Sequence, residues 1–328
     1  MKYLVVLALL SLTWPIYAQS VEFAPVTITE WPVPWKNTRP RDPYVESEHR
    51  VWFVGQGGDY VAMLDPATGK FQRYDLEKGT GPHNLIVDPS GHVWFAGNLK
   101  GYIGRLDPKT GEIVKYSMPD PAAADPHTLV FDSQGNIWFT VQGGNFVGRL
   151  IPATGDIRLI RVPTPNARPY GIVVDGRNRP WFTEFGSNRL GTVDPVTGQL
   201  REFLLPREDT RPRRLMVTSD GMVWYVDYAG GYLGRLDPTT GKVTEWRTPG
   251  GAEAHPYGMA VDDRDCLWLV ETGPKPNRLV GFDPVKGKFF SSTAIPSGGG
   301  SVRHMFFKST YSLWFGTDTN TIARARIG

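Results

Sequence analysis

Side chains that can transfer protons or bind anions recur at one position relative to a repeated tryptophan. Eleven residues before this tryptophan lie two histidines, two tyrosines and an arginine: His83, His127, Tyr170, Arg213 and Tyr257. The last copy has His304 at ten residues, and Tyr44 is the nearest equivalent in the irregular first copy. Imidazoles transfer protons near neutral pH, and guanidinium groups orient carboxylates or carbonyls. The spacing predicts one shared polar site, with His255, Arg214 and Arg303 nearby.

Carboxylates recur at a second position, three residues after the same tryptophan. Three successive copies have Glu184, Asp227 and Glu271 there, and the last copy has Thr317 followed by Asp318. Carboxylate oxygens can hold a divalent cation that polarises a carbonyl and stabilises an enolate. They could equally accept backbone N–H bonds between neighbouring units, so both interpretations stay open.

These positions are set by seven copies of one unit. Aliphatic–Trp–aromatic triplets and two variants place the tryptophans at intervals of 42 to 46 residues: Trp52, Trp94, Trp138, Trp181, Trp224, Trp268 and Trp314. In the second copy we expect four strands, at 83–88, 92–97, 102–106 and 112–118, separated by Gly, Pro and Asp turns. Four-stranded units of about 43 residues repeated radially are typical of a β-propeller. The fold class predicted is all-β, a seven-bladed propeller.

The two ends of the chain predict how the ring closes. The C-terminal segment 321–327 matches a third strand and leaves its blade without a fourth. The N-terminal segment 26–32 resembles the fourth strand at 242–249, so we expect it to complete the last blade and cover an open edge. The first blade is the least regular, with its innermost strand expected to be shortened between Pro43 and Trp52.

Composition bounds the remaining possibilities. Residues 1–18 combine a charged start, an apolar run and a small residue, which predicts a signal peptide and a periplasmic or secreted protein. The propeller domain is expected over 19–328, as a monomer without a membrane span. A net charge of +3 gives no reason to expect nucleic acid as a partner. The single cysteine, Cys266, excludes an internal disulfide.

Two pairs of motifs carry a resemblance to a known family. Arg-Pro-Tyr-Gly-Ile at 168–172 precedes Trp-Phe-Thr-Glu at 181–184, and Ala-His-Pro-Tyr-Gly at 254–258 precedes Trp-Leu-Val-Glu at 268–271. With these motifs the chain resembles the virginiamycin B lyase (streptogramin B lyase) family over nearly its whole mature length. The resemblance implies a seven-bladed propeller that opens a cyclic depsipeptide by magnesium-assisted β-elimination at an ester linkage.

The resemblance also implies roles for particular residues. His304 matches the family's catalytic histidine, while the glutamate two residues earlier is replaced by Val302. The later acid position falls on Thr317. Asp318 and Glu271 are therefore the candidate magnesium ligands. The predicted ligand is a small molecule or cyclic peptide at the mouth of the central channel, contacted by six side chains: Tyr257, His255, Arg213, Tyr170, His127 and His83.

We therefore carry three functions forward. The first is a metal-assisted carbon–oxygen lyase with His304 as the base. The second is an exported propeller that binds a ligand or protein without turnover, which the loss of a carboxylate at Val302 favours. The third is a lactonase-type hydrolase on the same architecture.

Overall fold

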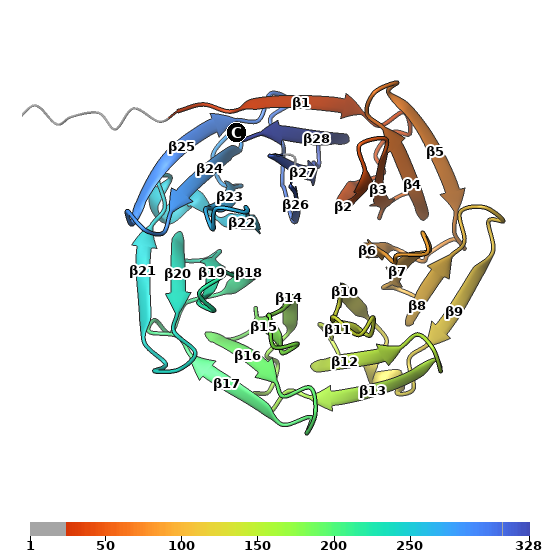
Figure 1. Ribbon diagram of the computed structural model, residues 1–328, viewed down its shortest axis with the longest axis horizontal. Helices are drawn as coiled ribbons and strands as arrows, with labels where there is room; N and C mark the ends of the chain where they lie inside the picture. Colours follow the sequence, from red (N-terminus) through yellow and green to blue (C-terminus); the bar gives the residue numbers. More distant parts are fainter. Residues whose placement is uncertain (1–23, 310) are drawn as a thin grey trace, which may run out of the picture.

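Seven four-stranded antiparallel sheets surround a central axis in the computed structural model, which describes residues 24–309 and 311–328 (Figure 1). The innermost strands are β2 (Pro40–Ser47), β6 (Pro82–Val87), β10 (Pro126–Phe131), β14 (Pro169–Val174), β18 (Pro212–Val217), β22 (Pro256–Val261) and β26 (Met305–Lys308). The second strands are β3 (Arg50–Gly55), β7 (Val93–Gly97), β11 (Ile137–Val141), β15 (Pro180–Glu184), β19 (Val223–Asp227), β23 (Leu267–Glu271) and β27 (Ser312–Gly316). The seven-bladed propeller is confirmed.

The outer half of each blade repeats in the same order. The third strands are β4 (Tyr60–Asp65), β8 (Tyr102–Leu106), β12 (Phe146–Ile151), β16 (Arg189–Val193), β20 (Tyr232–Leu236), β24 (Arg278–Asp283) and β28 (Thr321–Arg326). The outermost strands are β5 (Lys70–Asp75), β9 (Ile113–Ser117), β13 (Asp156–Arg161), β17 (Leu200–Leu204), β21 (Val243–Arg247), β25 (Lys288–Ala294) and β1 (Thr27–Pro32). Two short 3-10 helices, η1 (Pro121–Ala123) and η2 (Gly251–Ala254), precede β10 and β22.

The ring closes through the N-terminal strand, as predicted. Strand β1 pairs antiparallel with β28 over six residues, from Thr27 opposite Arg326 to Pro32 opposite Thr321. The indole of Trp31 stacks on that of Trp314, with ring centroids 5.5 Å apart. This pairing covers the β28 edge that would otherwise be exposed. The predicted signal peptide, residues 1–18, lies outside the described residues.

The first blade corrects one expectation. Its innermost strand is not shortened: β2 begins at Pro40, pairs with Gly55 and runs for eight residues. Two register shifts, after Arg41 and after Val45, accommodate the extra residues as β-bulges. The irregular spacing therefore reflects bulges within a full-length strand.

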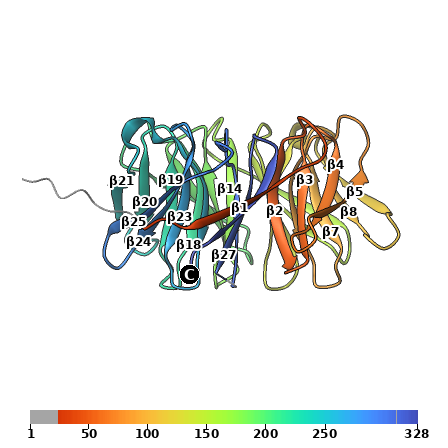
Figure 2. The same cartoon turned by 90° about the horizontal axis from the view of Figure 1, so that it is seen from above.

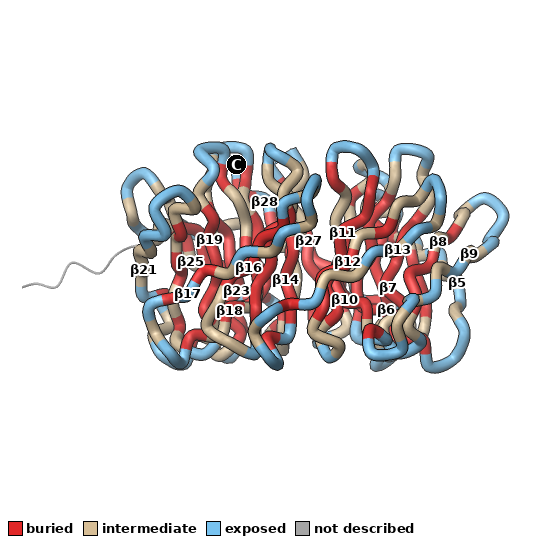
Figure 3. Tube along the Cα trace, turned by 90° about the horizontal axis from the view of Figure 1, so that it is seen from below, coloured by how far each residue is buried: buried red, intermediate tan, exposed pale blue. Residues whose placement is uncertain are grey.

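Buried apolar side chains fill the space between neighbouring blades. Figure 2 shows the ring of blades from the side, and Figure 3 shows exposed loops at both of its faces. The repeat tryptophans are buried, and six of them donate their indole N–H to a side chain six residues earlier. In five blades the glycine of the third strand lies under an aromatic ring; at Gly148 a Cβ atom would lie 2.1 Å from the ring of Phe139. No helix within residues 24–309 and 311–328 is long and apolar enough to cross a membrane.

The bond from the tryptophan indole should contribute measurably to stability. Asp262 accepts it from Trp268 at 3.1 Å and also accepts the backbone N–H of Cys266. We expect Asp262→Ala to lower the free energy of unfolding by about 1–3 kcal/mol, because it leaves a buried donor without a partner. Denaturant unfolding measures this. The exposed neighbour Asp263 is the control, and equal effects of Asp263→Ala and Asp262→Ala would contradict the prediction.

Candidate functional site

The start of each innermost strand brings one side chain to the central axis. In six blades a proline there pairs with the last residue of the second strand, as Pro82 does with Gly97. The residues that follow these prolines, together with Arg303 before β26, are called the axial ring: Arg41, His83, His127, Tyr170, Arg213, Tyr257 and Arg303. Arg303 is equivalent to His83 by strand register. His83 lies two residues before Leu85, which pairs with Phe95, and Arg303 lies two residues before Met305, which pairs with Phe315.

The axial ring brings together the predicted histidines and tyrosines. The imidazoles of His83 and His127 have centroids 3.5 Å apart, and His127 lies 4.1 Å from the ring of Tyr170. The Tyr170 and Tyr257 hydroxyls form a short hydrogen bond. These four side chains are buried. They pack against one another around the axis.

Sequence reasoning missed Arg41 in this ring. Tyr44 was the expected member of the first blade, but it pairs with Trp52 and contacts Phe306 with ring centroids 4.7 Å apart. Arg41 follows Pro40 and lies eleven residues before Trp52, so the signal was present in the sequence. The bulge after Arg41 obscured it.

The residues that follow the axial ring form a second tier, and it holds a buried charge cluster. The tier consists of Asp42, Asn84, Thr128, Gly171, Arg214, Gly258 and His304. Asp42 accepts bonds from Arg41 Nε at 3.0 Å and Asn84 Nδ2 at 3.0 Å, and its Oδ2 lies 3.5 Å from Arg214 Nη2. Arg214 also donates to Thr128 Oγ1 at 3.1 Å and to the backbone oxygen of Arg303 at 2.9 Å. Five blades are thereby joined through Asp42 and Arg214.

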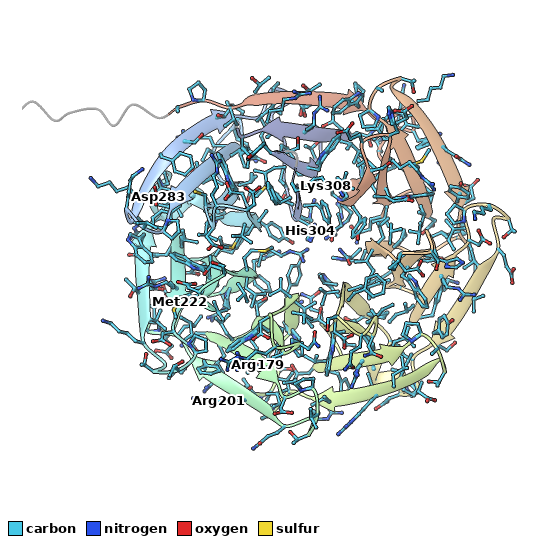
Figure 4. All side chains as sticks on the ribbon, in the orientation of Figure 1. Arg179, Arg201, Met222, Asp283, His304 and Lys308 are labelled. Carbon is cyan, nitrogen blue, oxygen red and sulfur yellow. The ribbon has the colours of Figure 1, made fainter. Side chains whose placement is uncertain are left out.

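His304 belongs to this second tier and lies near the centre of the ring (Figure 4). Of the three histidines at the axis, it alone is partly exposed. It lines a cavity of about 350 Å³ together with Asn84, Thr128 and mainly apolar side chains such as Met216 and Phe306. A concave apolar pocket with a few convergent polar groups is a typical ligand site. The cavity is bordered by the ends of the innermost strands, away from the predicted carboxylate rim.

Burial and positive charge keep the axial imidazoles neutral. Burial lowers the pKa of His304 to about 4, although Asp42 opposes this shift. Burial and nearby arginines hold the pKa of His83 and His127 well below the usual range. Burial would raise the pKa of Tyr170, but Arg41 and the other axial arginines outweigh it and lower that pKa. The site therefore holds neutral proton acceptors beside fixed cations.

Arg213 is a partly exposed member of the axial ring and lies in a cage of aromatic rings. Its guanidinium carbon lies 3.8 Å from the ring centroid of Phe185, 4.3 Å from Tyr228 and 4.4 Å from Tyr257. Arg213 forms no ion pair with any described residue. His255 stacks on Tyr228 with centroids 5.0 Å apart, which places this predicted contact residue at the outer wall of the cage.

The rim carboxylates accept hydrogen bonds from the loops around them. Glu271 Oε1 accepts the backbone N–H of Gly250 at 2.6 Å, and Asp227 accepts that of Arg211 at 2.9 Å. Glu184 Oε2 accepts the Ser187 hydroxyl at 2.9 Å. Asp227 and Glu271 thereby match the structural alternative that the sequence left open, whereas Glu184 accepts a hydroxyl instead of a backbone N–H.

Glu184 makes the stability pH-dependent. Burial and the neighbouring Glu202 raise the pKa of Glu184 to about 8, and its Oε1 is buried without a hydrogen-bond partner among the described residues. The folded state therefore binds this proton more tightly than the unfolded state, whose glutamate pKa is about 4.3. The Glu184 contribution is full below about pH 4 and is lost as pH rises towards 8, by up to about 1.4 kcal/mol per pH unit.

We expect Glu184→Gln to remove this dependence and to raise the free energy of unfolding at pH 8 relative to the unaltered protein. Denaturant unfolding at pH 5 and pH 8 measures both effects. Glu208→Gln, at an exposed position, should leave the slope unchanged. A Glu184→Gln variant whose stability falls between pH 5 and 8 as steeply as that of the unaltered protein would contradict the assignment.

The predicted magnesium ligands do not provide a site that fits a divalent cation. Both oxygens of Asp318 accept bonds from the Arg303 guanidinium, with Nη2 to Oδ2 at 2.7 Å. Val302 is buried in the apolar core beside Met305. Across the described residues, no group of three His, Cys, Asp or Glu side chains could hold a metal ion. Magnesium prefers several oxygen ligands, so its binding stays a prediction that this donor set does not support.

Comparison with known proteins supplies a further finding. The sequence model of the virginiamycin B lyase family matches residues 77–326. No curated protein sequence matches the chain. Selenomethionine-substituted virginiamycin B lyase from Staphylococcus aureus superposes with a TM-score of 0.83 at 25% identity, covering 92% of this chain and 99% of that one. The same values hold for a catalytically inactive histidine-to-alanine variant of that lyase with quinupristin. A streptogramin B lyase structure gives 0.83 at 24% identity, covering 92% and 98%, which supports the fold.

Proposed function

Because the chain belongs to the virginiamycin B lyase family, we propose that it is a carbon–oxygen lyase acting by β-elimination at the second tier of the axis. The observation that carries the proposal is a neutral imidazole, His304, that lines an apolar cavity beside two buried arginines, Arg41 and Arg214. This arrangement offers a proton acceptor at the cavity and fixed positive charge next to that acceptor. Both are needed when a carbon acid is deprotonated.

His304 is the general base of the proposed reaction. A substrate must reach the base, and the other two axial histidines are buried within the ring. The His304 side chain is partly exposed at the cavity, and its Nδ1 has no hydrogen-bond partner among the described residues. Asp42 lies beside the imidazole and favours the imidazolium that forms. Asp42 is thus a positioning residue that stabilises the charged base.

The proposed step is balanced without a metal or co-reactant. His304 takes the proton from the carbon α to a carbonyl, and that electron pair forms a double bond to the β-carbon. The bond between the β-carbon and the ester oxygen breaks, and the acyl group leaves as a carboxylate. Fixed guanidinium charges stabilise the negative charge that develops first at the carbonyl and then at the leaving group. Arg214 and Arg41 are the nearest such charges to the second tier.

The proposed substrate carries an ester oxygen on the carbon β to a carbonyl, as in a cyclic depsipeptide or a related ester. The apolar walls of the cavity suit a ligand with hydrocarbon side chains. Elimination opens a ring without adding atoms, so substrate and product are isomers of equal mass.

The test is a mass-spectrometric screen of cyclic depsipeptides and lactones with the purified protein. A ring-opened product of unchanged mass, carrying a new double bond, supports the lyase. A product heavier by one water identifies the lactonase-type hydrolase, and binding without any product identifies a binding propeller. Either of the last two results overturns the proposal.

We further propose that the protein is exported as a monomer after removal of residues 1–18. The charged start and apolar run of this segment support export. Cys266 is the single cysteine of the chain, so the exported protein would contain no internal disulfide. Fractionation of cells that produce the full-length chain, with N-terminal sequencing of the exported form, tests the cleavage.

A further inference from the structure

Several buried polar atoms at the axis have no hydrogen-bond partner among the described residues. They come from five different blades: Arg41 Nη2, His83 Nδ1, His127 Nε2, Arg213 Nε and His304 Nδ1. Most buried polar groups in proteins are paired, so each exception requires an explanation. Five of the thirteen such side-chain atoms among the described residues lie around this one axis, where a single ligand could meet several of them.

The charge at the axis is also incomplete. Arg41, Arg213 and Arg214 contribute three positive charges, and Asp42 is the one carboxylate that pairs with any of them among the described residues. Arg303 is neutralised separately by Asp318. The cluster therefore has a surplus of two positive charges in an environment from which burial largely excludes water.

We propose that the axial ring binds a carboxylate group, and that the substrate of the proposed elimination is a carboxylate carrying an oxygen substituent on its β-carbon. The inference rests on the proposed function for its reaction and on the arginines for its ligand. An anion would accept bonds from the free donors and balance the surplus charge. Guanidinium groups bind planar carboxylates particularly well.

Arg213 is the first contact for such a ligand. It is partly exposed, its guanidinium has no carboxylate partner among the described residues, and aromatic rings hold it in place. Arg41 lies deeper, with Nε on Asp42 and Nη1 on Gln56, which leaves Nη2 as a free donor. The neutral histidines between them can each offer one N–H without adding charge.

Carboxylate binding would also assist the proposed reaction. A free carboxylate on the α-carbon resists loss of the α-proton, because the resulting intermediate carries two negative charges. Bound guanidinium groups offset this charge, which is the part that a divalent cation plays where carboxylate ligands are available. The arginines would thus supply the positive charge near the substrate. A metal ion lacks carboxylate ligands here, because Asp318 pairs with Arg303 and residue 302 is a valine.

Calorimetry with malonate, malonamide and inorganic phosphate tests the ligand class at low ionic strength. Malonate should bind, while the neutral malonamide should give no heat. Arg213→Gln should weaken malonate binding at least tenfold, and Arg213→Lys should weaken it less because it keeps the charge. Arg201→Gln is the matched control: Arg201 also stacks on an aromatic ring, 4.3 Å from the centroid of Phe203, but lies on the outermost strand β17 (Figure 4).

Three results would overturn the inference: malonamide binding as tightly as malonate, phosphate binding without malonate binding, or equal malonate affinity in Arg213→Gln and the unaltered protein. A thermal unfolding transition for each variant ensures that lost binding does not reflect lost folding. The outcome is separable from that of the proposed function. Malonate binding without any turnover would reject the lyase and keep the carboxylate site, whereas elimination of neutral esters without malonate binding would do the reverse.

Discussion

Replacing Asp42 by alanine is expected to lower the free energy of unfolding by about 3–5 kcal/mol, because it leaves buried charges without their counter-ion. Arg41 and Arg214 are buried, and Asp42 is the carboxylate that both contact. Asn84 would also lose the acceptor of its side-chain amide. Denaturant unfolding near neutral pH measures the change.

Acid should remove the same contribution from the unaltered protein. Burial opposes ionisation of Asp42, but Arg41, Arg214 and Asn84 outweigh it and hold its pKa well below the usual range. Because the folded-state pKa is depressed, the contribution is present above the unfolded pKa of about 3.9 and is lost as pH falls below it. The stability gap between the unaltered protein and Asp42→Asn should therefore shrink below about pH 4. A loss under about 1 kcal/mol in Asp42→Ala, or a gap independent of pH, would contradict the cluster.

Replacing His304 by alanine is expected to reduce turnover about 100- to 10,000-fold, the range that a positioned general base contributes. The effect should fall mainly on kcat, because proton removal belongs to the transition state and the cavity walls remain. Initial rates on an ester that the protein opens measure it. His49→Ala is the control, since the His49 side chain is 70% exposed and pairs with Asp65 in a turn. A His304→Ala variant that retains more than a tenth of the activity would exclude His304 as the base.

The architecture could be predicted from the sequence because the spacing of the repeated motifs gives the length and number of the blades. Seven tryptophans at nearly constant spacing fix the blades, and the likeness of 26–32 to 242–249 identified the closing strand that β1 supplies. In the second blade the expected strand at 102–106 agrees with β8, and the others agree within a residue. Alternation between strands and tight turns leaves little freedom within each unit.

The gathering of these side chains at the axis was predicted, but their detailed arrangement was not. The spacing that selected His83 and His127 also fits Arg41, but Arg41 was passed over because the bulge after it makes the blade irregular. It also could not separate the two tiers, so His304 was placed in the ring although it lies one residue further along. Asp42 escaped notice, and Arg214 was named without its partners, because both depend on contacts between blades.

Side-chain packing decided the rest. Sequence spacing brings residues to one axis, but it does not show whether they line an opening or fill it. The imidazoles of His83 and His127 are tilted against each other with centroids 3.5 Å apart, and the Tyr170 and Tyr257 hydroxyls are hydrogen-bonded, so these side chains contact one another around the axis. The cavity beside His304 is formed by apolar residues at the other end of the innermost strands, which no polar motif marked.

The most direct test of the central claim is the mass of the product formed from an opened ester, measured with and without a metal chelator. The account predicts an isomeric product of unchanged mass, formed at the same rate in chelator, because His304 and the axial arginines supply the acceptor and the positive charge. A product that has gained a water, or a reaction that the chelator abolishes, would contradict it.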